Sequence, residues 1–133
     1  MILVDTSVWI ELLAGRMPSL TAGQLLQFAT CGPVVQEVLQ GLRPRRESVE
    51  FQESFLALPC LSDPLSLGLF LEAANIFREG RRQGYTIRST MDCLIAAIAI
   101  ENTVAVWHRD RDFDTIAKYT PLRVSPPLVP RVQ

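Results

Sequence analysis

Histidine and cysteine are scarce in this chain of 133 residues. His108 is the only histidine, and the three cysteines, Cys31, Cys60 and Cys93, lie far apart. An odd number of widely spaced cysteines fits neither a disulfide framework nor a zinc site, which needs closely spaced Cys or His pairs. We therefore expect a protein of a reducing compartment, the cytoplasm, whose fold depends on a hydrophobic core.

Long apolar runs and glycine-rich phosphate loops are also missing. No segment reaches the roughly 18 uncharged apolar residues of a membrane span, and the apolar residues after Met1 have no basic leader before them. Neither a Walker-type loop nor a G-x-G-x-x-G motif occurs, so nothing supports binding of a nucleoside triphosphate or a dinucleotide. The sequence predicts neither a membrane segment nor a signal peptide.

Lysine is almost absent, and neither sign of charge dominates. The 13 basic and 14 acidic residues leave a net charge of −1, which disfavours binding of polyanions through bulk charge. Lys118 is the only lysine, and the arginines cluster at 43–46, 78–82, 88 and 109–111. Clustered Arg favours phosphate recognition, because a guanidinium can donate two parallel hydrogen bonds to phosphate. The alternative is that these clusters lie on solvated helix faces and pair with nearby Glu.

Strand-like and helix-like apolar segments alternate along the chain, whose hydrophobic content of 48% is that of one globular domain. Strands are predicted at 2–4 and 103–107, with weaker candidates at 59–62 and 122–124. Helices are predicted at 8–13, 20–29, 33–40, 47–58, 65–83, 91–101 and 113–118, with a turn at 30–33 that has room for a very short strand. The alternation favours an α/β fold, an α/β/α sandwich with a mainly parallel central sheet. We expect this domain at 1–124 and an extended, mobile Pro-rich tail at 125–133.

Four aspartates occur where the predicted strands end or the most apolar helix begins. Asp5 follows the strand at 2–4, and Asp110 and Asp112 follow the strand at 103–107. Asp92 lies in the first turn of the helix at 91–101, which is apolar on all sides and must therefore enter the core beside the strands. Because the carboxyl ends of parallel strands share one edge, where open sheets bind ligands, we expect these acids to meet there.

Structural roles explain the same acids one at a time. Asp5 could simply end the strand and cap the next helix. Asp92 lies three residues after Ser89, so it could complete a capping box or stabilise the helix dipole. Glu37, on the helix at 33–40, is expected to face solvent on local grounds alone. These alternatives stay open at the level of single residues.

Several acids at one edge of a sheet would repel one another strongly unless a cation neutralised them. Because a zinc-type ligand set is absent, the natural partner is a hard divalent cation, Mg²⁺ or Mn²⁺. A carboxylate metal site next to Arg residues is suited to phosphodiester hydrolysis, since the metal activates water and Arg holds the flanking phosphates.

Four motifs occur in order along nearly the whole chain: ILVDTSVW at 2–9, VQEVLQG at 35–41, RSTMDCLIAA at 88–97 and DRDF at 110–113. In sequence and spacing they resemble the motifs of PIN-domain ribonucleases of the VapC type, the toxins of type II VapBC toxin–antitoxin pairs. The resemblance implies a PIN-like fold and a Mg²⁺-dependent (or Mn²⁺-dependent) endoribonuclease. It also implies three partners: an RNA substrate, a small VapB-like antitoxin protein and a second copy of the chain in a homodimer.

The resemblance also assigns residues to the site. The metal-binding acids of the family carry over to Asp5, Glu37, Asp92 and Asp110, with Asp112 as a candidate fifth. Hydroxyl residues that support the acids or bound water carry over to Thr6, Ser7 and Thr90. The Arg residues beside these motifs, and thus the candidates for RNA binding, are Arg88, Arg109 and Arg111.

Trp107-His108-Arg109 departs from the family pattern, because many relatives have a small hydroxyl residue and then Arg or Asn before the fourth motif. The bulky Trp leaves open whether Asp110 or Asp112 faces the metal. His108 could contact RNA or transfer a proton, although a single histidine is more often structural.

Two other functions remain as alternatives. A phosphatase of the haloacid-dehalogenase type also has an Asp after its first strand, but it needs an acid two residues later, where this chain has Ser7. A PIN fold without catalytic activity would act only through protein or RNA contacts. For the antitoxin, the apolar residues Trp9, Leu12 and Leu13 offer a docking surface, unless they belong to the core.

Overall fold

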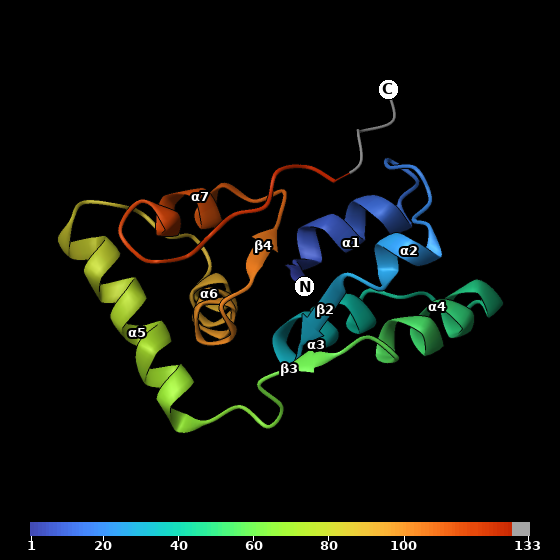
Figure 1. Ribbon diagram of the computed structural model, residues 1–133, viewed down its shortest axis with the longest axis horizontal. Helices are drawn as coiled ribbons and strands as arrows, with labels where there is room; N and C mark the ends of the chain where they lie inside the picture. The colour runs from blue at the N-terminus through green and yellow to red at the C-terminus, as the bar shows by residue number, and fades with distance from the viewer. Residues whose placement is uncertain (129–133) are drawn as a thin grey trace.

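Four short strands form the centre of the computed structural model, which describes residues 1–128 (Figure 1). They are β1 (Ile2–Val4), β2 (Phe28–Cys31), β3 (Cys60–Leu61) and β4 (Ala105–Trp107). The strand order is β3-β2-β1-β4, and every pairing is parallel. Val4 pairs with Trp107, so β1 and β4 end at the same level and the residues that follow them start side by side.

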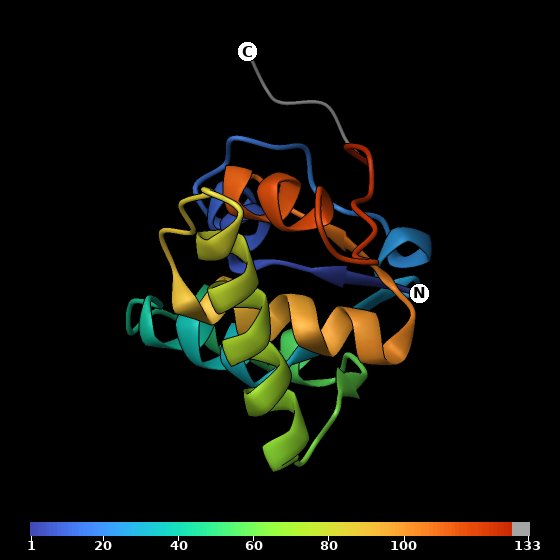
Figure 2. The ribbon, with the colours of Figure 1, turned by 90° about the vertical axis from the view of Figure 1, so that its left-hand side faces the viewer.

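Helices cover both faces of this sheet. Within residues 1–128 they are α1 (Thr6–Leu13), α2 (Ala22–Leu25), α3 (Gly32–Gln40), α4 (Arg46–Leu56), α5 (Leu67–Arg82), α6 (Thr90–Asn102) and α7 (Arg111–Ala117). α1 and α7 lie on one side of the sheet and α3 and α6 on the other, with α5 packed against α6 (Figure 2). The predicted α/β/α sandwich with a central parallel sheet is therefore confirmed.

α6 is the central helix, as its apolar sequence predicted. Its residues 92–99 are all buried, and it packs against α3, α5, α7 and β4. A helix that buries every side has no solvent-facing stripe, so its first turn must open into the protein interior. The N-terminus of α6 consequently brings Asp92 to the edge of the sheet where β1 and β4 end.

Trp9 belongs to the core. Its ring packs edge-on against Phe28, Phe51 and Phe55, with centroid distances of 6.3, 5.9 and 5.1 Å. Edge-to-face contacts at these distances are the favoured arrangement of aromatic pairs. Of the apolar residues considered for docking a partner, Leu13 is exposed, whereas Trp9 is only 3% exposed.

The segment 28–31 differs from the prediction. A helix was expected as far as residue 29, but α2 ends at Leu25 and Phe28–Cys31 is β2. All four residues of β2 are buried, because helices cover both faces of the sheet. A strand buried on both faces shows no alternation, so its apolar residues resemble the end of a helix.

The C-terminal strand candidate is reduced to one isolated parallel bridge, between Val106 and Val124. Pro126 and Pro127 follow at once and cannot donate to a strand ladder. Of the predicted tail at 125–133, residues 129–133 lie outside the described residues, and the domain boundary at 124 stays a prediction. None of the helices at 1–128 is long and apolar enough to cross a membrane, and the cytoplasmic location also stays a prediction.

Candidate active site

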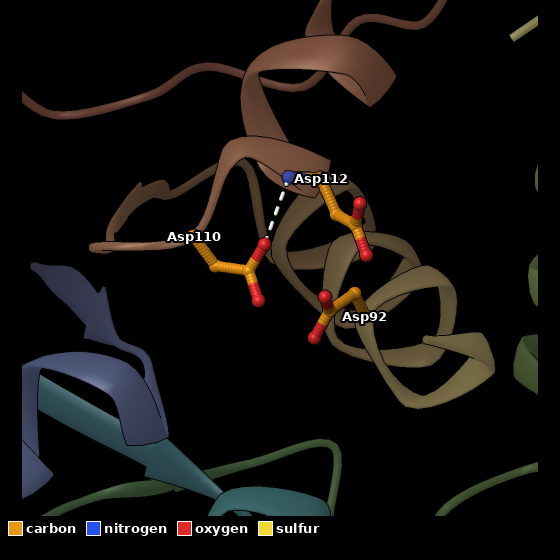
Figure 3. Close-up of side chains that lie close together, drawn as sticks. All are labelled: Asp92, Asp110 and Asp112. Carbon is orange, nitrogen blue, oxygen red and sulfur yellow. Dashed lines mark hydrogen bonds between the residues drawn. The ribbon is translucent and has the colours of Figure 1, made fainter. Parts of the chain in front are cut away.

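Three aspartates meet where β4 ends and α6 begins. Figure 3 shows Asp92 on α6 beside Asp110 and Asp112 at the start of α7, with their carboxylates around one space. One oxygen of each lies within 4.8 Å of one oxygen of the other two. Such a group could hold a metal ion, because three carboxylates at this distance repel one another in its absence.

Asp92 is the least satisfied member of the group. Its side chain is buried, and Oδ2 has no hydrogen-bond partner among the described residues. Burial raises the pKa of Asp92 to about 8, and the charges of Asp5 and the other two aspartates add to this effect. The side chain of Ser89 makes no capping bond to α6, so the capping-box alternative for Asp92 is wrong.

Asp110 and Asp112 are joined by Arg88, from the loop before α6. Nη2 of Arg88 lies 2.8 Å from Oδ1 of Asp110, and Nε lies 3.4 Å from Oδ1 of Asp112. Oδ2 of Asp112 accepts from the backbone N–H groups of Arg88 and Ser89, both at 3.1 Å. Both oxygens of Asp112 are thus engaged with protein, whereas the described hydrogen bonds of Asp110 use only Oδ1, which also accepts from the N–H of Asp112.

Asp5, the residue between β1 and α1, and Glu37 of α3 lie outside this group of three but close enough for their charges to act on one another and on it. Oδ2 of Asp5 accepts from the backbone N–H of Ser7, at 3.0 Å, and from its hydroxyl, and Thr6 donates to Oε1 of Glu37 at 3.0 Å. Burial raises the pKa of Asp5 despite the bonds from Ser7, and the charge of Asp110 raises it further. Burial also raises the pKa of Glu37, with a contribution from Asp5. Asp5 therefore caps α1 and also faces the other acids, and Glu37 is not simply a solvated residue.

The hydroxyl of Ser7 also connects the ends of β1 and β4. While it donates to Asp5, it accepts from the backbone N–H of Arg109 at 2.9 Å. Of the remaining predicted site residues, Thr90 and Arg111 are exposed.

His108 has a structural environment. Its Nδ1 accepts from the backbone N–H of Asp110 at 3.1 Å, and Nε2 lies 3.2 Å from a carboxylate oxygen of Asp114. The ring also packs against Phe113, with centroids 5.2 Å apart. These contacts fix the start of α7 and leave His108 only slightly exposed, which agrees with the structural interpretation of this residue.

Arg88 and two backbone groups have roles that sequence reasoning missed. Arg88 was assigned to RNA, but its guanidinium pairs with two acids of the site. Its position four residues before Asp92 was the only available signal. The N–H groups of Arg88 and Ser89 leave no trace in the sequence, because any residue except proline can supply them.

Comparisons with known proteins identify the family and the fold of the chain. The PIN domain family model matches residues 2–119. Ribonuclease VapC11 of Mycobacterium tuberculosis is 36% identical over 132 residues, covering 94% of this chain and 98% of its own. Two solved structures share the fold. VapBC-1 of nontypeable Haemophilus influenzae has a TM-score of 0.68 at 19% identity and covers 94% of this chain and 97% of its own. VapBC-5 of M. tuberculosis, of the VapBC family of toxin–antitoxin systems, has a TM-score of 0.65 at 18% identity, with coverages of 92% and 94%. The chain belongs to the PIN domain family, among its VapC-type members.

Proposed function

We propose that this protein is a Mg²⁺- or Mn²⁺-dependent endoribonuclease that hydrolyses RNA phosphodiester bonds at its carboxylate cluster. The observation that carries the proposal is the buried Oδ2 of Asp92, which has no hydrogen-bond partner among the described residues and faces further acids. A buried carboxylate in this position needs either a proton or a cation. The ribonuclease name of its 36%-identical relative supports the same activity.

The donor set fits a hard divalent cation, since every candidate ligand is a carboxylate oxygen. The proposed ligands are Asp5, Glu37, Asp92 and Asp110. A bound Mg²⁺ or Mn²⁺ supplies an activated water and charge stabilisation for the leaving oxygen. Asp112 is better suited to positioning, because both its oxygens already bind Arg88 or Ser89 and so fix α6 against α7.

Arg88, Arg109 and Arg111 stay proposed contacts for RNA. The side chain of Arg88 is 49% exposed, so its outer side is open to a phosphate while its inner side holds the acids. Arg111 is exposed at the start of α7. A phosphate that approaches the cluster would therefore meet positive charge before it reaches the acids.

A cleavage assay with purified protein tests the proposed function. RNA should be cut in Mg²⁺ or Mn²⁺ and left intact in EDTA, and a small phosphate ester should not be hydrolysed. Cleavage that persists in EDTA would exclude a metal-dependent site. Release of phosphate from the ester with no effect on RNA would instead favour a phosphatase.

We propose further that the protein is the toxin of a pair and binds a small antitoxin in an apolar cavity between α1 and α4. The cavity has a volume of about 320 Å³ and is lined by Leu12, Leu13, Leu20 and Phe51, with Ser54 at its edge. Apolar grooves of this kind accept the apolar face of a partner helix. The likeness to VapBC-5, named as a toxin–antitoxin system, supports such a partner.

Replacing Ser54, which is exposed, by Glu would put a charge at the edge of this cavity. Ser54→Glu should cut RNA normally but escape inhibition by the small protein encoded beside it. Ala57→Glu, at an exposed position just after the same helix, is the matched control and should still be inhibited. Equal inhibition of both variants would place the partner elsewhere.

The proposed homodimer has support from α5. This helix exposes Leu67, Phe70 and Leu71, which are 74%, 48% and 59% exposed. Apolar side chains grouped on one exposed helix favour burial against a partner surface. Leu71→Glu should therefore lower the mass measured by light scattering from that of two chains to that of one.

A further inference from the structure

A hollow of about 530 Å³ lies between α1 and α3 and extends from Glu37 to the loop that joins α3 to α4. Its two ends differ in charge, because Glu37 lines one and Arg43 and Arg45 line the other. Between them the wall includes apolar side chains from α1, those of Ile10 and Leu13. The hollow thus joins an acid of the candidate active site to a pair of basic side chains.

Arg43 and Arg45 lack an internal counter-ion. Both are exposed, and neither side chain forms a hydrogen bond or an ion pair with any part of the chain at 1–128. The next residue, Arg46, differs, since it pairs with Glu50 at 3.4 Å. On α5, Arg82 is likewise bound to Glu79. The two free guanidinium groups are therefore available for an external anion.

The apolar part of the hollow is accessible as well. Ile10 is 51% exposed and Leu13 is 46% exposed, although both lie beside the active site on α1. An exposed apolar surface next to unpaired Arg suits a ligand with flat apolar groups and regularly spaced negative charges. Single-stranded nucleic acid has both features, because its bases are free to leave the stack and its phosphates follow one another along the backbone.

We propose that this hollow binds single-stranded RNA on one side of the cleaved phosphodiester, with backbone phosphates at Arg43 and Arg45 and a base against Ile10 and Leu13. The proposal rests on the proposed nuclease function and extends its site past Glu37. Continuity with the carboxylate cluster favours RNA over an acidic protein segment, since the substrate chain must leave the cluster in some direction. A duplex would keep its bases stacked and could not place one against α1.

Removing both charges tests the proposal. The double variant Arg43→Gln, Arg45→Gln should fold normally, because both side chains are exposed and unpaired. Binding of a fluorescent single-stranded RNA of random sequence is measured by anisotropy at several salt concentrations, with Ca²⁺ in place of Mg²⁺. Each phosphate contact in a single strand contributes about 0.7 to the slope of log K against log salt. The double variant should therefore lose about 1.4 from this slope, bind several-fold more weakly at low salt and show a lower kcat/KM.

Arg78→Gln, Arg81→Gln is the control for net charge. It removes the same charge from α5, which lies on the opposite side of the molecule from α4 (Figure 1). The control should keep the wild-type slope and kcat/KM. If the slope of log K against log salt fell equally in both double variants, the change would be explained by net charge alone. That result would overturn the assignment of the phosphate contacts to the hollow.

A second variant tests the same hollow while keeping both arginines. Gly41 lines the hollow, and a Cβ there would meet nothing closer than 3.6 Å. Gly41→Glu should therefore fold and weaken RNA binding by adding a negative charge between the two ends. Wild-type affinity in this variant, together with an unchanged slope in Arg43→Gln, Arg45→Gln, would overturn the proposal.

Two further results separate this proposal from others. If the wild type cuts no RNA in Mg²⁺, the nuclease function fails, whereas a reduced slope in the double variant would still show that the hollow binds RNA. If the double variant binds RNA with the wild-type slope but escapes inhibition by the co-encoded small protein, the hollow is a protein-binding site and the proposal is wrong.

Discussion

The five acids of the candidate site form the carboxylate cluster and fall into two halves that are held in place by different chemistry: Asp5 and Glu37 on one side, and Asp92, Asp110 and Asp112 on the other. In the hydroxyl half, Asp5 and Glu37 each accept a hydrogen bond from a neighbouring side chain of α1, Ser7 or Thr6. Among the described residues, no basic side chain pairs with either acid. A hydroxyl stabilises a carboxylate without bringing a positive charge, so burial still raises the pKa of both acids.

In the arginine half, which consists of Asp92, Asp110 and Asp112, a positive charge is built in. Arg88 binds Asp110 and Asp112 directly, and its own backbone N–H completes the hold on Asp112. Asp92 has no such contact, although it lies in the same group. Arg88 therefore balances part of the negative charge, and we expect a cation to change the protonation of Asp92 more than that of the other acids.

The two halves suggest a division of labour. The hydroxyl half keeps its acids oriented but without a positive charge beside them, so we expect a bound cation to be attracted by both. The arginine half keeps the first turns of α6 and α7 together even without a cation, since its bonds cross between them. We expect removal of the cation to affect activity and the charge on Asp92 more than the fold.

The largest effect is expected from Asp92→Asn, which removes the unpartnered charge. Loss of several kcal/mol of charge stabilisation in the transition state corresponds to a fall in kcat of roughly 100-fold or more. The melting temperature in EDTA at pH 8 should rise at the same time, because the amide avoids the burial of a charge. Both are measured on purified protein, by RNA cleavage and by circular dichroism.

Asp63→Asn, at an exposed position outside the cluster, is the control for this substitution. It should change neither kcat for RNA cleavage nor the melting temperature in EDTA. Normal cleavage by Asp92→Asn would show that the buried carboxylate serves the fold alone. The difference between the hydroxyl half and the arginine half would then affect the stability of the fold and not catalysis.

The next largest effect is expected from Arg88→Gln, which turns the arginine half into a second unbalanced half. Asp112, whose side chain is 2% exposed, would keep only backbone donors, so the melting temperature in EDTA should fall by several degrees. Mg²⁺ should raise the melting temperature more in this variant than in the wild type, since a cation can replace the lost charge.

Arg111→Gln is the matched control, because this arginine is exposed and pairs with no acid of the site. Mg²⁺ should stabilise it as much as the wild type. If Mg²⁺ raised the melting temperature of Arg88→Gln by no more than that of the wild type, Arg88 and the cation would not balance the same charges.

A smaller effect is expected from pH in the absence of metal. The pKa of Asp92 is about 8 in the folded protein and lies near its ordinary value of 3.8 in the unfolded chain. Between these values the folded state binds more protons, so the free energy of unfolding falls as pH rises. In EDTA, the melting temperature should decrease from pH 5 to pH 8, and Asp92→Asn should flatten this decrease. A melting temperature that rises over this range in the wild type would contradict the assignment.

The sequence predicts the placement of the acids better than their partners. Asp5 and Asp110 could be placed because parallel strands end at one edge, and Asp92 because a helix without a polar face must point its first turn inward. The pairing of Arg88 with Asp110 and Asp112 joins residues 22 and 24 positions apart. It depends on how two loops face each other, which no local pattern encodes.

The fold was predictable to a similar extent. The alternation of strands and helices predicted the sandwich, and the apolar helix at 91–101 predicted its centre. The end of α2 and the start of β2 were not predictable, because Phe28–Cys31 is buried throughout and its apolar residues resemble the end of the preceding helix. Local patterns thus placed the apolar helix α6 and the strands β1 and β4, and failed for β2, whose apolar residues follow closely on those of α2.

The smallest effect is expected within the hydroxyl half, from Ser7→Ala compared with Thr6→Val. Each substitution removes one side-chain donor to an acid, but Ser7 also accepts from the backbone N–H of Arg109 and so connects the two strand ends. A hydrogen bond to a charged group contributes about 1.5–3 kcal/mol, and Ser7→Ala also leaves the N–H of Arg109 without this acceptor. Ser7→Ala should therefore lower kcat about 10-fold and also lower the melting temperature, whereas Thr6→Val should lower kcat by less and leave the melting temperature nearly unchanged. Ser7→Thr is the control, since it keeps the hydroxyl, and it should recover most of the activity. If Thr6→Val proved the more damaging change, the connection between β1 and β4 through Ser7 would be dispensable, and the two halves of the cluster would be held independently of each other.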